Sequence, residues 1–272
     1  MTLSDTYDTQ GYASPIDVMP ADEAAALHAR LEQIEHSRGG RLSNVLNSKA
    51  HLLMPFLWDV VQDPRILDPV RAVLGDDVLC WGSSFFSKDP GSDDDVPLHQ
   101  DCTVWGLTEP VGLTAWLALS PSTAETGCMR MQPGSHKTVQ KHVIRNHPSS
   151  MLPLGEELQQ DVQDDDMVLC PLDPGQMSIH HVLTVHGSLP NRSQDIRRVG
   201  FAIRYIPGHV AQVGDSKGYA TLVSGRDHGT YELEHKPEAD FAPEALRRHQ
   251  RIIAASARRV IGQAAQLENE RA

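Results

Sequence analysis

The sequence predicts an α+β fold in which helices flank an antiparallel β-barrel or sandwich. Two stretches near the start, 20–38 and 55–75, have apolar residues at helical spacing, and this spacing returns from Pro243 to about Glu270. The middle of the chain consists of short segments rich in β-branched and aromatic residues, separated by Pro and Gly. Helices that precede and follow a run of strands, rather than alternating with them, favour an antiparallel core.

The individual elements follow from local signals. The first predicted helix, PADEAAALHARLEQIEHSR (20–38), has acidic residues near its start, and the second is interrupted near Pro64 and ends at Gly75. The predicted strands are 77–88, 111–120, 127–132, 176–186 and 197–206. Because we find no internal repeat and no linker, we expect one domain over 1–272, with a helical segment at about 20–75, a core at about 77–210 and a helical extension at about 240–271.

The charge balance excludes several classes of partner. The chain has 36 acidic against 24 basic residues, a net charge of −12, which argues against nucleic-acid or anionic-membrane binding. No apolar run is long enough to span a bilayer, and the N-terminus lacks a basic region followed by a hydrophobic stretch. The four cysteines are widely spaced and are typical of reduced thiols. We therefore expect a cytoplasmic protein that acts on a small molecule, and a homo-oligomer is compatible with the sequence.

The stretch PLHQDCTVWGL (97–107) contains the first candidate site. If it is a strand, His99 and Asp101 point to the same side. They would supply two ligands of the two-histidine, one-carboxylate triad, which leaves open positions on Fe(II). In a chain with 14 histidines about one such pair is expected by chance. The pair therefore needs a third ligand to be convincing.

A second stretch, HHVLTVHGSLPNRSQDIRRVGFAIRYIP (180–207), provides candidates for that ligand. His180 and His181 are predicted in mid-strand, where a packed or hydrogen-bonded role is the commoner one. His186 is predicted at a strand end before a Gly-Ser turn, a place where functional side chains are often found. We therefore predict His186 as the ligand. An arginine at the start of the next strand could pair with a carboxylate.

Three motifs together resemble the bacterial branch of the phytanoyl-CoA dioxygenase family: HQDCTVWGL (99–107), ETGCMRMQPGSH (125–136) and HGSLPNRSQDIRRVGFAIRY (186–205). The resemblance implies a double-stranded β-helix (jelly-roll, cupin-like) core and a reaction that needs Fe(II), 2-oxoglutarate and O2. It implies that His99, Asp101 and His186 are the iron ligands and that Trp116 and Ser188 line the 2-oxoglutarate pocket.

The arginine that binds 2-oxoglutarate is ambiguous in the sequence. Spacing from the distal histidine gives Arg197, whereas alignment on the following RVGFA block gives Arg198. Strand alternation favours Arg198, because one face would be small and cationic and the other bulky and apolar. Arg204 shares the face of Arg198, but six residues along a strand span about 20 Å, so Arg204 cannot reach the carboxylate that Arg198 would hold. We therefore expect Arg204 to form a buried ion pair instead.

The resemblance implies hydroxylation of an unactivated C–H bond with release of succinate and CO2. In halogenating relatives the position of Asp101 is a small residue, so the sequence favours hydroxylation over chlorination. A halogenase-like or other oxidative tailoring enzyme, a zinc hydrolase and a non-catalytic jelly-roll binding protein remain alternatives.

No cationic cluster suited to CoA is evident, and we predict a small polar or zwitterionic substrate. Arg41, Asn44 and Lys49 are candidate substrate contacts, and Trp105 is either a pocket wall or a core aromatic.

Overall fold

Two mainly antiparallel sheets pack against each other in a computed structural model that describes residues 2–145, 147–214 and 216–269, with side chains described as far as Arg258. The strand order of the large sheet is β1 (Tyr12–Asp17), β9 (Gln176–His181), β4 (Leu113–Ala118), β11 (Arg198–Pro207), β2 (Val78–Lys88), β12 (Gly218–Ser224) and β13 (Tyr231–Leu233). The order of the small sheet is β3 (Val96–His99), β10 (His186–Ser188), β5 (Met129–Met131) and β8 (Val168–Cys170). Strands β6 (His142–Ile144) and β7 (Glu156–Leu158) form a separate pair.

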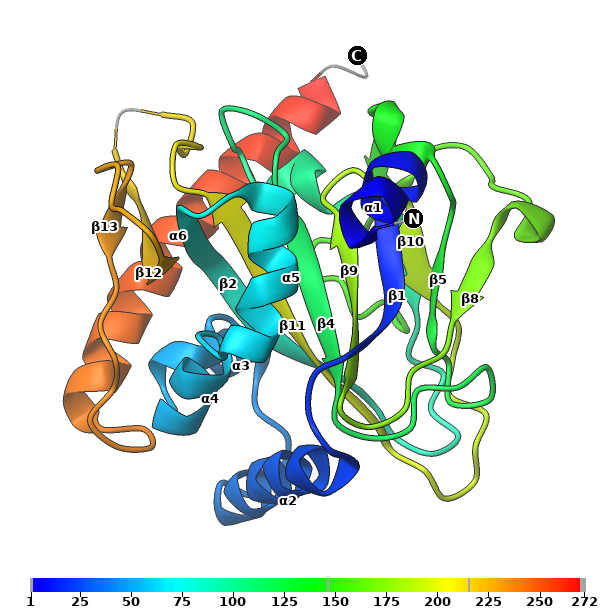
Figure 1. The fold of residues 1–272 in the computed structure, drawn as a ribbon, viewed down its shortest axis with the longest axis horizontal. Helices are drawn as coiled ribbons and strands as arrows, with labels where there is room; N and C mark the ends of the chain where they lie inside the picture. Colours follow the sequence, from blue (N-terminus) through cyan, green and yellow to red (C-terminus); the bar gives the residue numbers. More distant parts are fainter. Residues whose placement is uncertain (1, 146, 215, 270–272) are drawn as a thin grey trace.

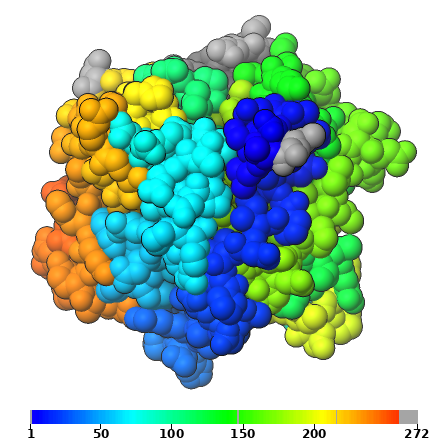
Figure 2. Space-filling model, viewed as in Figure 1, coloured from blue at the N-terminus to red at the C-terminus, as the bar shows by residue number. Residues whose placement is uncertain are grey.

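The N-terminal helices cover one face of the large sheet (Figure 1), and the blue and cyan residues hide that face in Figure 2. These helices are α1 (Leu3–Gln10), α2 (Ala21–Ser37), α3 (Asn44–Asn47), α4 (Pro55–Val60) and α5 (Pro64–Leu74). The long α6 (Pro243–Asn269) contacts β12, β6 and the turn after β3. Short 3-10 turns are η1 (Ala50–Leu52), η2 (Asp101–Val104), η3 (Ser135–Lys137) and η4 (Asp164–Asp166). None of the described helices combines the length and apolarity needed to cross a membrane.

The predicted helices are confirmed, including the interruption of the second one. The chain leaves helical geometry after Val60 and re-enters it at Pro64, because Asp63 caps the new helix and proline is tolerated at its first position. Helix α5 stops at Leu74, and Gly75 follows with a φ of 87°. The large sheet extends beyond the predicted 77–210 core, since β1 pairs with β9 and β12 pairs with β2.

Three local predictions around the candidate site are wrong. The predicted single strand 176–186 is divided, because the chain leaves the large sheet after His181 and enters the small sheet at His186. Gly187 and Ser188 lie inside β10 rather than in a turn. Asp101 does not continue the strand of His99 but begins the η2 turn. The two side chains therefore converge through a change of backbone direction and not through strand alternation.

The predicted alternation along β11 is confirmed. Its bulky apolar residues join the core between the large sheet and the helices; these are Val199, Phe201, Ile203 and Tyr205. Strand β4 alternates in the same way and places Leu113, Ala115 and Leu117 in that core. The residues between them face the small sheet, where Trp116, Ala118 and Ala202 pack against Met129 and Met131. The large sheet thus has one apolar face under the helices and one mixed face toward the interior.

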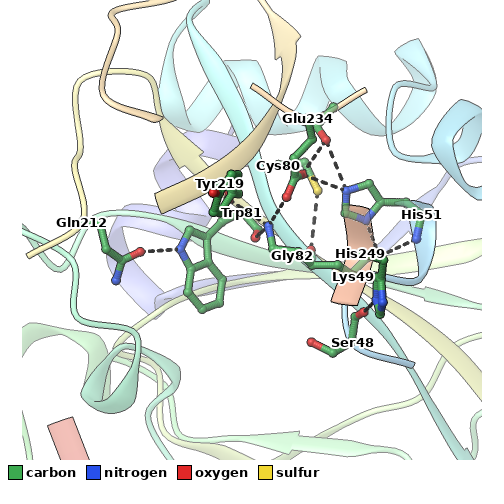
Figure 3. A network of polar contacts seen from close by, with 12 residues as sticks. Ser48, Lys49, His51, Cys80, Trp81, Gly82, Gln212, Tyr219, Glu234 and His249 are labelled. Carbon is green, nitrogen blue, oxygen red and sulfur yellow. Dashed lines mark hydrogen bonds and ion pairs between the residues drawn. The ribbon is translucent and has the colours of Figure 1, made fainter. Parts of the chain in front are cut away.

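A buried polar network joins the N-terminal segment to the far strands of the large sheet (Figure 3). Lys49 donates to Glu234 at 2.7 Å and to the carbonyl oxygens of Trp81 and Tyr219. Nε2 of His51 lies 3.4 Å from the same carboxylate. Burial alone would raise the pKa of Glu234, but Lys49 and His51 lower it to about 2. The carboxylate therefore stays charged and holds the Lys49 ammonium and the His51 ring in place.

We expect Glu234→Gln to destabilise the protein by about 3 kcal/mol at pH 7, because Lys49 would lose its counter-charge in a buried site. The pKa of the wild-type carboxyl is lowered on folding, so its contribution is full above the unfolded value and is lost as pH falls from about 5 toward 2. Urea unfolding at pH 7 and pH 3 should therefore show a smaller acid-induced loss in the variant than in the wild type. Glu244→Gln, which removes an exposed pair with Arg247, is the control. Equal losses in Glu234→Gln and wild type would contradict this role.

Candidate metal centre and cavity

Three side chains converge between the sheets. One donor atom each of His99, Asp101 and His186 lies within 4.8 Å of the other two, and all three residues are buried. His99 at the end of β3 is the register partner of His186 at the start of β10. The two rings are 4.3 Å apart between centroids. The structure thus brings together the three residues that the sequence predicted as ligands.

Hydrogen bonds to the backbone orient both imidazoles. Nδ1 of His99 lies 2.9 Å from the carbonyl oxygen of Pro97, and Nδ1 of His186 lies 3.0 Å from that of Thr184. Only a protonated nitrogen can donate to a carbonyl, so each neutral ring keeps its lone pair on Nε2. Thr114 donates to Oδ2 of Asp101 at 2.7 Å and fixes the carboxylate. Such outer partners are what metal-ligating histidines and carboxylates normally have.

The protonation states of Asp101 and His186 suit a cation, whereas the effect of burial on His99 is outweighed by the Asp101 carboxylate, which raises the pKa of His99. A metal would therefore have to displace the proton of that ring. Burial would raise the pKa of Asp101, but His180 and His99 reverse this and keep the pKa well below the ordinary value. Burial, followed by the neighbouring His180 and His99, holds the pKa of His186 well below the imidazole value. Metal ligands must be deprotonated. A carboxylate and a neutral imidazole are therefore available at neutral pH.

His180 lies against this centre, which the sequence interpretation missed. It comes from β9 of the large sheet, and its Nε2 is 3.5 Å from Oδ2 of Asp101. Its ring is 4.2 Å from that of His186, and neither of its nitrogens has a hydrogen-bond partner among the described residues. Buried nitrogens without a partner are costly unless a ligand or water satisfies them. Alternation could have revealed this, since Met177 and Ile179 pack under the helices and leave His180 facing inward.

A cavity of about 910 Å³ extends from the centre between the two sheets, and its lining includes Trp116, Ser188 and Arg198. The guanidinium of Arg198 donates to the carbonyl oxygen of Gly127 and lies 5.3 Å from the Trp116 ring. A Cβ atom at Gly200 would be 1.8 Å from this indole, so only glycine leaves room for Trp116 in its position. Burial lowers the pKa of Arg198 to about 10, which leaves it charged at neutral pH.

The two neighbouring arginines have opposite environments. Arg197 lies outside the cavity and donates to Glu35 at 2.7 Å, and its Nε is 3.2 Å from Asp89. Arg198 lies inside and is only 2% exposed. Opposite it in register, Lys88 donates to the Ser188 hydroxyl at 2.7 Å, and burial followed by Arg198 lowers the pKa of Lys88 to about 6. Of these two neighbouring arginines, it is thus Arg198 that faces the cavity.

The other predicted contacts have mixed outcomes. Arg41, Asn44, Lys49 and Trp105 all line the cavity. The amine of Lys49 is already occupied by Glu234, and Arg41 forms ion pairs with Asp89 and Asp94. The prediction that Arg204 forms a buried ion pair is wrong, because no carboxylate oxygen of the described residues lies within 4.0 Å of its guanidinium. Arg204 instead lines the cavity and donates to Ser84 at 2.9 Å.

A jelly roll that encloses two histidines and one aspartate has the ligand set of the non-haem iron oxygenases. A family model described as Phytanoyl-CoA dioxygenase (PhyH) matches residues 7–199, so the chain belongs to this family. Family membership and the donor set together make the protein an iron- and 2-oxoglutarate-dependent oxygenase.

Individual relatives agree with this family. The chain is 28% identical to a "Probable alpha-ketoglutarate-dependent hypophosphite dioxygenase" of Stutzerimonas stutzeri over 72% of this chain and 76% of that protein. It is 29% identical to a 1-deoxypentalenic acid 11-beta-hydroxylase of Streptomyces arenae, over only 53% of each chain. The apo structure of the non-heme monooxygenase ThoJ superposes with a TM-score of 0.86 and 29% identity, covering 97% of this chain and all of that one. The predicted jelly-roll fold is thereby confirmed.

We expect His99→Ala, Asp101→Ala and His186→Ala each to weaken Fe(II) binding by more than about 100-fold, since even outer-shell changes cost 10- to 100-fold. His180→Ala should cost about tenfold, the lower end of the outer-shell range, because His180 contacts Asp101 but lies outside the three-residue group. Anaerobic calorimetric titration with Fe(II) measures these affinities, with His181→Ala as the matched control. A loss in His180→Ala as large as that in His186→Ala would make His180 a ligand.

Proposed function

We propose that the protein hydroxylates an unactivated C–H bond of a small molecule, with His99, Asp101 and His186 as the iron ligands. The observation that carries this proposal is the combination, in one cavity, of a three-donor centre and a buried arginine. Three protein ligands leave three positions of an octahedral ion open. Iron held by these three side chains would supply the activation of O2, coupled to the conversion of 2-oxoglutarate to succinate and CO2.

Arg198 is the residue we assign to the distal carboxylate of 2-oxoglutarate. Its guanidinium is buried, faces the cavity and is without a carboxylate partner in the described part of the chain, and its Nε has no hydrogen bond there. A guanidinium can hold a carboxylate through two parallel hydrogen bonds. Trp116 and Ser188 border the same end of the cavity, where they would limit the space around the co-substrate and exclude water.

The alternative functions fit this cavity less well. A zinc hydrolase could use the same three ligands, but it would have no use for a buried arginine that lacks a counter-ion. A non-catalytic binding protein would not need oriented donors with open positions beside them. The halogenase-like alternative is disfavoured because Asp101 occupies the position that halide would take. A hydroxylase among the relatives is consistent with the choice of hydroxylation.

Arg198→Met is expected to abolish formation of the Fe(II)–2-oxoglutarate complex, because the distal carboxylate would lose its charged partner. Anaerobic addition of Fe(II) and 2-oxoglutarate to the wild type should produce a weak visible charge-transfer band that needs both components. The band should be absent in Arg198→Met at the same concentrations and retained in Arg197→Met, whose partner Glu35 lies outside the cavity. If the folded Arg197→Met variant lost the band and Arg198→Met kept it, Arg197 would be the residue that binds 2-oxoglutarate. Absence of the band in the wild type would remove the proposed function.

A further inference from the structure

Arg204 is a cation that faces the cavity and has no counter-ion among the residues that the structure describes. It lines the cavity and is partly exposed, and within the described part of the chain its guanidinium donates a hydrogen bond to Ser84 at 2.9 Å. The fields of Asp101 and Glu156 act on Arg204, but neither carboxylate of these described residues forms an ion pair with it. A guanidinium has five N–H donors and keeps its charge in proteins. Most of the binding capacity of Arg204 is therefore unused.

Aromatic rings surround this guanidinium. Its Cζ atom is 6.0 Å from the ring centroids of both Phe86 and Trp105. Trp105 in turn stacks on Trp81, with centroids 4.6 Å apart and an interplanar angle of 15°. Gln212 accepts from Nε1 of Trp81 at 3.2 Å (Figure 3) and donates to the carbonyl oxygen of Trp105. The wall around Arg204 is thus both apolar and held in a fixed position.

Charge balance indicates what this position is suited to bind. Fe(II) has two positive charges and Arg198 has one, while Asp101 has one negative charge and 2-oxoglutarate has two. These charges cancel, so the charge of Arg204 remains in excess once metal and co-substrate are bound. Glu156 also lines the cavity, and among the described residues it forms no ion pair with Arg204. An uncompensated charge in a desolvated site favours a ligand of opposite sign.

We propose that Arg204 is the substrate anchor, and that the substrate is an organic anion whose acidic group pairs with Arg204 while an apolar, ring-sized body packs against Trp105 and Phe86. This inference rests on the proposed function and narrows the predicted polar or zwitterionic substrate to an amphipathic anion. The cavity volume of about 910 Å³ lies at the upper end of the range for drug-sized ligands and accommodates such a molecule beside 2-oxoglutarate.

The position of Arg204 also places the bound anion relative to the metal centre. Arg204 is the register partner of Thr114 on β4, and the Thr114 hydroxyl donates to the ligand Asp101. Arg198 lies six residues away on the same strand, about 20 Å along its length. The co-substrate and the substrate anion would therefore be held by separate cations, and neither arginine could replace the other.

The test uses two dyes that differ only in a sulfonate: 8-anilinonaphthalene-1-sulfonate and the neutral N-phenyl-1-naphthylamine. The sulfonate dye fluoresces when bound to apolar protein surface. Protein loaded anaerobically with Fe(II) and 2-oxoglutarate is titrated with each dye. Wild type should bind the sulfonate at least about tenfold more tightly than the neutral dye, as expected for a hydrogen-bonded ion pair. Arg204→Gln should lose this preference without weakening the neutral dye, and Arg204→Lys should retain part of it.

Arg41→Gln is the matched control, because Arg41 lines the same cavity but is already paired with Asp89 and Asp94. It should keep the preference for the sulfonate. Equal affinities of wild type for the two dyes would overturn the proposal without any variant, as would an unchanged preference in folded Arg204→Gln. The charge-transfer band distinguishes failure of the proposed function from failure of the proposed substrate class. A band without dye preference contradicts only the substrate class, whereas a dye preference without a band leaves the anion site and removes the oxygenase assignment.

Discussion

The side chains of β11 alternate between an apolar core and the cavity, and this alternation controls where the charged groups of the interior lie. Val199, Phe201, Ile203 and Tyr205 are buried under the N-terminal helices. Each such side chain contributes about 1.5–3 kcal/mol when fully buried. Moving the strand by one residue would place all of them in the cavity and both arginines in the apolar core. The apolar face thus offsets the cost of keeping Arg198 and Arg204 away from bulk water.

The metal centre depends on both sheets. The three predicted ligands come from the small sheet and the turn that follows it, whereas Thr114 and His180 approach from the large sheet. The register of β3 with β10 sets the distance between His99 and His186. The packing of one sheet on the other sets the position of Asp101 relative to its hydrogen-bond donor. A change that separates the sheets would therefore disturb the ligands even where no ligand is altered.

Much of this arrangement could be predicted from the sequence, but the changes of strand direction could not. Alternation along 197–206 predicts that Arg198 faces inward, and the three motifs predict the ligands. The break between His181 and His186 has no local signal, because the intervening residues are β-branched or apolar without a proline or glycine, and only pairing with different sheets divides the stretch. The strand around Pro15 was also missed. This strand, β1, lies at the edge of the large sheet and pairs on one side with β9. A proline is tolerated at such an edge.

The two inward arginines of β11 differ in what surrounds them, and this difference separates their roles. Arg198 is almost completely buried beside Lys88 and Trp116, in a space that fits a small, fixed ligand such as a co-substrate. Arg204 is partly exposed to the wide part of the cavity and is bordered by aromatic rings. If Arg198 holds 2-oxoglutarate as proposed, its environment is tied to that one co-substrate. The second environment can change with the substrate, so residues such as Phe86 and Trp105 would determine which molecule is oxidised.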